Sequence, residues 1–358
     1  MQAFNKKLLV LGMGGTIAGR SQAQGDNVGY RAGELPVESL LPRGVNDVEC
    51  LANVQIETRQ IAQMDSKDMD HATWFVLARA VLAACADEAV AGIVITHGTD
   101  TLEETAFFLS QLFTPSKPVV LTCAMRPATA LSPDGPQNMV DALCVAANPS
   151  ADGVWVVAAG AVHRPTQVAK VHPYRTDAFS SGETGPVGVV EEGRLRWLHP
   201  AGGNSFARTP STAASRQFEG SSNLGPDANA LLARLESQGL PRVEWVVSHA
   251  GVTPAAVTTC LMAGGEGGAV RGLVLVCTGN GTFHQCLTKP LRDAEACGVW
   301  LRRSTRCTQG SIVVGATSVD WPVAMPLDPV KARIALSLDI ARHDLAGLTP
   351  QATAPVPG

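Results

Sequence analysis

The sequence predicts two α/β domains, a larger N-terminal domain with a parallel sheet and a flexible lid loop, and a smaller C-terminal α/β domain. Short apolar runs rich in β-branched residues alternate with helical segments in the first half, a pattern typical of a parallel sheet with helices on both faces. A polar stretch rich in Gly and Ser then interrupts the alternation, and a second alternating set follows. The predicted divisions are a catalytic domain at 1–195, a linker at 196–240 and a second domain at 241–358.

The composition is that of a globular chain. The 358 residues suffice for two domains, and 45% hydrophobic residues provide a sizeable core. The net charge is −4, with 28 Lys and Arg against 32 Asp and Glu, so no basic surplus is present to neutralise a phosphate backbone. Nucleic acid is therefore not an expected partner.

Apolar runs in the sequence are short. Runs such as 272–276 and 117–121 fall far below the ~20 residues of a membrane span, so no membrane segment is predicted. Two lysines precede an apolar stretch near the N-terminus, but this stretch ends at Gly12 and is too short for the ~7–15 apolar residues of a signal peptide. The expectation is a cytoplasmic protein.

The nine cysteines form no CxxC pair, and their number is odd. Most have apolar neighbours, which favours buried small side chains in a reducing compartment. Neither the cysteines nor the eight histidines show the clustered spacing of a zinc site, so no metal is predicted.

The elements of the first domain follow from apolar runs and glycines. The first strand ends in glycine, and the Gly-rich polar stretch 14–33 is typical of a mobile loop or a hairpin. Thr101 and Glu104 match a capping box at the start of a helix. Strands are predicted at 6–12, 91–98, 117–125 and 153–160, and helices at 67–86, 101–113 and 134–148.

The second domain repeats this alternation after the linker. Its apolar β-branched runs predict strands, and the segments between them predict helices. The strands are expected at 243–251, 272–281 and 298–305, and the helices at 255–263, 284–296 and 328–343.

Three polar segments come at the ends of predicted strands, at 14–19, 96–104 and 124–127, and ligands of such sheets bind at the carboxyl ends of strands. The first segment is no dinucleotide fingerprint, because Ile17 takes the third glycine position; P-loop and GxSxG strings are absent. Thr16 and Thr99 are candidate nucleophiles, although a threonine hydroxyl needs an activating base. Asp100 beside Thr99 is equally explained as a helix cap.

Several strings in this order resemble one family, the bacterial-type L-asparaginase/glutaminase family. The resemblance extends over nearly the whole chain and is densest in 8–180. The matching strings are the two threonine signatures GGTIAG (14–19) and THGTDTLEETA (96–106), the segment AMRPATALSPDGPQN (124–138), the substrate-binding serine loop MDSKDM (64–69), the lysine segment around Lys170, and TGNGT (278–282) and RRSTRCTQG (302–310) of the second domain.

The resemblance implies a role for each matching residue. It makes Thr16 the nucleophile, oriented by Tyr30 of the lid, and Thr99, Asp100 and Lys170 the second catalytic group. Lys170 would move a proton for Thr99 or water, provided burial favours its neutral amine; without the resemblance it would be an ordinary surface lysine. Ser66 and Asp100 would hold the α-carboxylate and α-ammonium of the substrate, and the backbone N–H groups of Thr99 and Ala124 would stabilise an oxyanion.

The implied reaction is hydrolysis of L-asparagine to L-aspartate and ammonia through an acyl-enzyme, without a cofactor. The family also implies a homo-oligomer, a tetramer built as a dimer of dimers, in which a neighbouring second domain closes each site. Hydrolysis of another ω-amide, such as L-glutamine or a substituted asparagine, is the alternative. The amidase subunit of a tRNA-dependent amidotransferase shares the threonine motifs but carries an extra N-terminal domain, and a non-catalytic sensor would not need Thr16, Thr99, Asp100 and Lys170 together.

Three departures from the family pattern leave the substrate preference open. Lys67 follows Ser66 where a glutamine is usual, no glutamate follows Arg306 where a neighbour's acid is expected, and Gly251 takes the place of an asparagine. Lys67 either brings positive charge to the substrate loop or turns outward to pair with Asp68 or Asp70.

Overall fold

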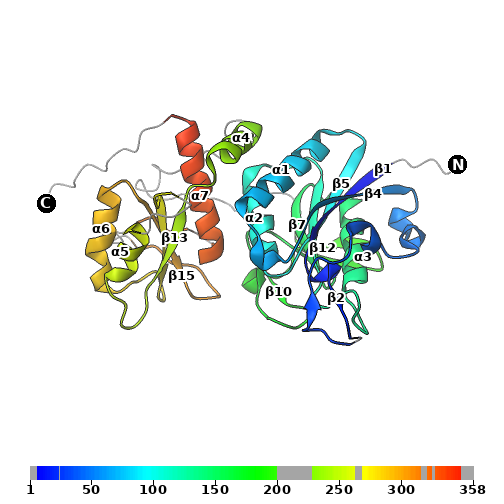
Figure 1. Ribbon diagram of the computed structural model, residues 1–358, viewed down its shortest axis with the longest axis horizontal. Helices are drawn as coiled ribbons and strands as arrows, with labels where there is room; N and C mark the ends of the chain where they lie inside the picture. The colour runs from blue at the N-terminus through cyan, green and yellow to red at the C-terminus, as the bar shows by residue number, and fades with distance from the viewer. Residues whose placement is uncertain are drawn as a thin grey trace. The chain divides into compact units, whose positions relative to one another are not determined.

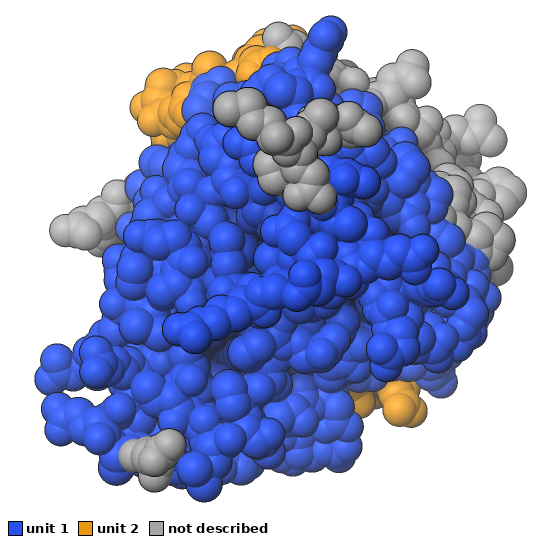
Figure 2. All heavy atoms as spheres, turned by 90° about the vertical axis from the view of Figure 1, so that its right-hand side faces the viewer, with its two compact units in different colours: residues 1–208 blue, residues 209–358 orange. Residues whose placement is uncertain are grey.

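The computed structural model describes residues 6–23, 25–199, 228–262, 268–315, 321–324 and 327–347. The chain forms two compact units, residues 1–208 and 209–358 (Figures 1 and 2). The predicted linker spans 196–240, and its residues 200–227 lie outside the described part. The described end of that range contains a helix, α4 (Ala228–Gln238).

Unit 1 is built on an eight-stranded sheet in the order β12-β11-β8-β7-β6-β5-β1-β4. One side of the sheet is parallel and contains β4 (Val54–Met64), β1 (Lys6–Gly14), β5 (Val90–Thr96), β6 (Pro118–Thr122) and β7 (Gly153–Ala158). The antiparallel side contains β8 (Ala161–His163), β11 (Gly188–Glu191) and β12 (Arg194–Trp197). The predicted parallel sheet is confirmed.

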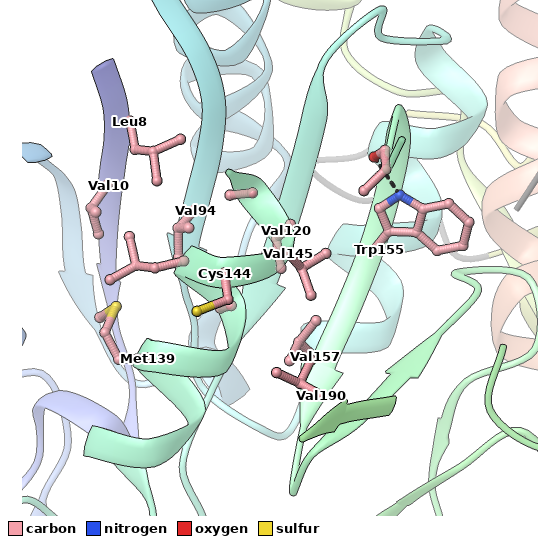
Figure 3. Close-up of a cluster of buried hydrophobic side chains, with 14 of the residues drawn as sticks. Leu8, Val10, Val94, Val120, Met139, Cys144, Val145, Trp155, Val157 and Val190 are labelled. Carbon is pink, nitrogen blue, oxygen red and sulfur yellow. Dashed lines mark hydrogen bonds between the residues drawn. The ribbon is translucent and has the colours of Figure 1, made fainter. Parts of the chain in front are cut away.

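Helices cover both faces of this sheet. α1 (His71–Ala86) and α2 (Leu102–Leu112) lie on one face, and α3 (Gly135–Ala146) lies on the other (Figure 1). On the α3 face, Val94 and Val120 from adjacent strands pack in one buried cluster with Met139 and Val145 of the helix (Figure 3). Burial of such side chains, at about 25 cal/mol per Å² of apolar surface, holds α3 on the sheet.

The connections β5–α2–β6 and β6–α3–β7 have opposite hands. Both advance one strand in the same direction along the sheet, but their helices lie on opposite faces. One of the two therefore departs from the right-handed rule for parallel strands. The first residue of α3, Gly135, lies against Ile17 and Ala124 in the segments that follow β1 and β6.

Two local predictions are wrong. The Thr101–Glu104 capping box does not form, because the Thr101 hydroxyl donates to the Ser66 carbonyl at 2.9 Å. The helix expected from residue 67 begins at His71, because the Asp70 carboxylate accepts the Thr73 N–H at 2.8 Å and caps it there. Residues 66–68 instead form a short 3₁₀ turn.

Unit 2 contains a parallel sheet in the order β13-β14-β15, formed by β13 (Val243–Val247), β14 (Gly272–Cys277) and β15 (Trp300–Thr305). Its helices after α4 are α5 (Ala255–Met262), α6 (Thr288–Ala296) and α7 (Pro329–Leu345), all within the predicted segments or a few residues of them. Among the residues described in both units, no helix is long and apolar enough to cross a membrane.

Candidate active site

Four neighbouring strands of unit 1 each deliver one predicted site residue at their carboxyl end. Thr16 follows β1, Ser66 follows β4, and Thr99 follows β5. Ala124 follows β6 and is fully buried. Because β4, β1, β5 and β6 are adjacent in the sheet, these residues lie along one edge of it.

The turn that carries Thr16 depends on two glycines. Gly14 and Gly15 have φ of 92° and 79°, which side-chain-bearing residues rarely adopt, and they turn the chain directly into a 3₁₀ turn (Thr16–Ala18). The Gly15 N–H donates to the Met64 carbonyl at 2.8 Å and ties this turn to the end of β4. Thr16 is only 6% exposed, so its hydroxyl is held in a largely dry place.

Tyr30 contacts Thr16 from the predicted lid. The two hydroxyl oxygens lie 2.7 Å apart in a hydrogen bond. Tyr30 belongs to β3 (Tyr30–Arg31), which pairs antiparallel with β2 (Arg20–Ser21), so the Gly-rich stretch is a hairpin. The sequence left open a loop or a hairpin, and the structure has the hairpin.

Lys170 joins the second threonine to the carboxylate beside it. Its ammonium nitrogen lies 2.7 Å from the Thr99 hydroxyl and 2.6 Å from Asp100 Oδ1. The lysine side chain is 17% exposed and that of Asp100 is 52% exposed. Solvent therefore reaches the carboxylate but is largely excluded from the lysine. Lys170 sits on β9 (Ala169–Lys170), and its backbone N–H donates to the Glu103 carboxylate of α2.

Two glycines bring the two threonine groups together. A Cβ placed on Gly15 would lie 2.3 Å from the Gly98 Cα and 2.4 Å from its nitrogen. The two backbones therefore touch, and only glycine fits at this contact. Since each glycine precedes its threonine directly, the contact sets the spacing of Thr16 and Thr99.

Ser66 is packed beneath the second threonine turn. Its side chain is 2% exposed, and its hydroxyl accepts the Asp100 N–H at 3.2 Å. The neighbouring Lys67 turns outward and pairs with Asp65 at 2.8 Å and Asp68 at 3.0 Å. The expected partner Asp68 is present, and Asp65 replaces Asp70, which caps α1.

The backbone around Ala124 is held by α3. Asp134 accepts the N–H groups of Met125 and Arg126, each at 2.9 Å. A Cβ on Gly135 would lie 3.0 Å from Ile17 and 3.4 Å from the Ala124 Cβ, so the first turn of α3 sits between these two segments. The helix thereby positions both the Thr16 turn and the segment after β6.

The sequence reasoning missed a buried chain of polar groups behind Thr99. Trp74 Nε1–H donates to the Thr105 hydroxyl at 2.8 Å, which leaves that hydroxyl to donate to His97 Nε2 at 2.9 Å. His97 then carries its proton on Nδ1 and donates to the Gly98 carbonyl at 2.8 Å. Burial lowers the pKa of His97 to about 4 and keeps it neutral. The sequence does hold a signal for this chain of polar groups, because His97 stands directly between a buried apolar strand and Gly98.

The site therefore offers two threonine hydroxyls, a lysine, a carboxylate and backbone N–H groups at the end of a sheet. A hydroxyl nucleophile, a proton-moving group and oxyanion donors are what nucleophilic attack on an amide carbon requires. In the described ranges, no group of three or more His, Cys, Asp or Glu side chains is placed to hold a metal ion.

Comparison with known proteins points to the same chemistry. The model of the family "Asparaginase, N-terminal" matches residues 7–201. A glutaminase-asparaginase of Pseudomonas fluorescens is 32% identical over 91% of this chain and 84% of its own. A probable periplasmic L-asparaginase of Haemophilus influenzae is 31% identical over 94% of this chain and 88% of its own. The crystal structure of a probable cytoplasmic L-asparaginase from Campylobacter jejuni superposes with a TM-score of 0.78 at 29% identity, covering 94% of this chain and 96% of that one.

Fold, site chemistry and similarity together define an amidohydrolase. The family match covers more than half of the chain, and the relatives match along most of their own length. The chain belongs to the asparaginase family.

Proposed function

We propose that this chain hydrolyses L-asparagine to L-aspartate and ammonia through an acyl-enzyme on Thr16. The observation that carries the proposal is the pair of threonines at adjacent strand ends, one bonded to Tyr30 and the other to Lys170. Thr16 attacks the amide carbon, and the backbone N–H groups of Thr99 and Ala124 stabilise the oxyanion. Ammonia leaves with the proton that Thr16 loses.

The Thr99–Lys170–Asp100 group serves the second half of the reaction. Water attacks the Thr16 ester, and a proton of this water passes through Thr99 and Lys170 and is returned to the departing Thr16 oxygen, which restores the hydroxyl. Asp100 holds the lysine at 2.6 Å and receives the α-ammonium of the substrate on its exposed side. Ser66 and the backbone N–H groups around it receive the α-carboxylate.

The side-chain amide could also be that of L-glutamine. The relative from Pseudomonas fluorescens is named for both amides, while two other matches are named for asparagine alone. Ammonia release across L-asparagine, L-glutamine, substituted asparagines and succinamic acid decides the preference. We expect the highest kcat/KM with L-asparagine; a higher value with L-glutamine would reverse the assignment.

Replacement of the nucleophile tests the mechanism. Thr16→Ala should lower kcat to background, because no other group in the proposal forms the acyl-enzyme, while the circular dichroism spectrum stays that of the wild type. Thr16→Ser keeps a hydroxyl and should retain measurable turnover. Ammonia release from Thr16→Ala near the wild-type rate would exclude Thr16 as nucleophile.

We further propose a cytoplasmic location and a homotetramer built as a dimer of dimers. The similarity to a probable cytoplasmic L-asparaginase supports the location, although a matching relative is described as periplasmic. The segments TGNGT and RRSTR of the second unit support the tetramer, since they resemble the part that closes a neighbouring site in the family.

A further inference from the structure

Two of the nine cysteines lie side by side in unit 1, away from the residues of the proposed reaction. The sulfur atoms of Cys50 and Cys144 are 2.7 Å apart, although 94 positions separate them in the sequence. This separation exceeds the S–S bond length of about 2.05 Å by only about 0.7 Å. Most cysteines were expected to be buried in apolar surroundings, but only Cys123, Cys144 and Cys277 are buried.

Both cysteines are fixed by the structure around them. Cys144 lies in α3 between the fully buried Leu143 and Val145, within the core cluster (Figure 3). Cys50 lies in a 3₁₀ turn (Glu49–Leu51), in which Leu51 is fully buried and its carbonyl accepts the Asn46 side-chain amide at 2.8 Å. Both sulfur atoms are therefore carried by helical elements that buried neighbours hold in place.

The two thiols differ in access and acidity. Cys50 is exposed and Cys144 is buried, so a reagent in solution reaches Cys50 first. A hydrogen bond with Cys144 lowers the pKa of Cys50, whereas that same bond and burial raise the pKa of Cys144. An accessible, more acidic thiol beside a sheltered partner is the arrangement of an attacking and a resolving cysteine.

We infer that Cys50 and Cys144 form a reversible intramolecular disulfide that locks the 3₁₀ turn to α3. The oxidant is a low-molecular-weight disulfide such as oxidised glutathione. The Cys50 thiolate attacks one sulfur of this disulfide, forms a mixed disulfide and releases one thiolate. Cys144 then loses its proton to solvent and attacks the Cys50 sulfur, which forms the protein disulfide and releases the second thiolate.

The expected consequence is greater stability of unit 1 with little change in the reaction. The bond would close a long loop, and disulfides of this kind raise the melting temperature of a domain of this size by on the order of 5–10 °C. Cys144 lies six residues along α3 from Asn138, whose side chain donates to the Cys123 carbonyl near the site. The helix is already packed there, so kcat should stay within about two-fold.

The experiment uses the full-length chain equilibrated in reduced and in oxidised glutathione. Oxidised protein should yield a Cys50–Cys144 cross-linked peptide in mass spectrometry and melt at higher temperature, and dithiothreitol should reverse both changes. Cys50→Ser should abolish them. Cys144→Ala is the second variant, and in it Cys50 should stop at the mixed disulfide with glutathione.

The matched control is Cys297→Ser, since Cys297 is also exposed but lies in unit 2. It should respond as the wild type does. The inference is overturned if wild-type Cys50 stops at the mixed disulfide, if another pair forms the cross-link, or if Cys50→Ser gains the same melting temperature on oxidation.

Discussion

Lys170 shows most directly how single side chains divide the work at this site. Its nitrogen touches a hydroxyl and a carboxylate at once, and its side chain is mostly buried. Ser66, by contrast, is hydrogen-bonded to the Asp100 backbone N–H. This placement fits a residue that moves protons rather than one that grips the substrate.

Lys170→Met should therefore lower kcat by several orders of magnitude and change KM little. The methionine fills a similar volume but cannot exchange a proton with Thr99. Steady-state ammonia release at saturating and limiting L-asparagine measures both constants. If KM rose and kcat remained, Lys170 would be a binding residue and the relay would be wrong.

Two buried histidines make the stability depend on pH. Burial lowers the pKa of His97 and of His163 to about 4, against about 6.5 in an unfolded chain. Between these values the unfolded state binds more protons, so stability rises with pH across this window and is lost as pH falls from about 6.5 to about 4. The carboxylates with lowered pKa, such as Asp26 and Asp70, act only at still lower pH.

We expect each histidine to lower the free energy of unfolding by about 2 kcal/mol when the pH falls from 7 to 5. His163→Gln removes one of the two titrations and should reduce the loss by that amount. Urea denaturation of the full-length chain and of the His163→Gln variant at both pH values, followed by tryptophan fluorescence, measures this loss. An equal loss in the variant and the wild type would contradict the assignment to His163.

At the scale of elements, the contact between Gly15 and Gly98 sets the distance between the two threonine turns. Gly15→Ala places a Cβ 2.3 Å from the Gly98 backbone and forces the two threonine turns apart. A displacement of about 1 Å lowers kcat/KM by about a hundred-fold. The loss should appear in the rate with L-asparagine while the sheet content by circular dichroism stays unchanged.

Gly182→Ala is the control for backbone strain. Gly182 also has a positive φ, 57°, but a Cβ there meets nothing within 4 Å. It should lose about 1 kcal/mol of stability and keep its activity. If both variants lost activity alike, strain rather than the Gly15–Gly98 contact would explain the result.

The sequence predicts elements well where they are apolar and bounded by glycine. It misses β4, because polar residues such as Gln55, Glu57 and Arg59 interrupt the apolar ones of this strand. β4 is also an edge strand and pairs with β1 alone. It locates Thr16 and Thr99 at strand ends by pattern, but Lys170 only by resemblance, because its strand has two residues and its partner Thr99 lies 71 positions away. Which face of the sheet α3 covers is set by tertiary packing, and local pattern carries no information about it.

For the whole molecule, the testable expectation is assembly. Light scattering should give four times the chain mass of 37.4 kDa for the active protein. The physical reason is that Asp100 is 52% exposed, so a substrate ammonium there would face water unless another surface closed the site. An active species with the mass of a single chain would refute the tetramer.

The position of β1 between β4 and β5 also has a consequence for folding during synthesis. Residues 8–11 are apolar and end fully or almost fully buried, but their second partner strand finishes only at Thr96. At a synthesis rate of about 5–20 residues per second, this stretch stays without that partner for on the order of 5–15 s. The apolar face of this stretch is thus open to chaperones and to misfolding during synthesis, because β1 is translated well before β5 pairs with its other edge.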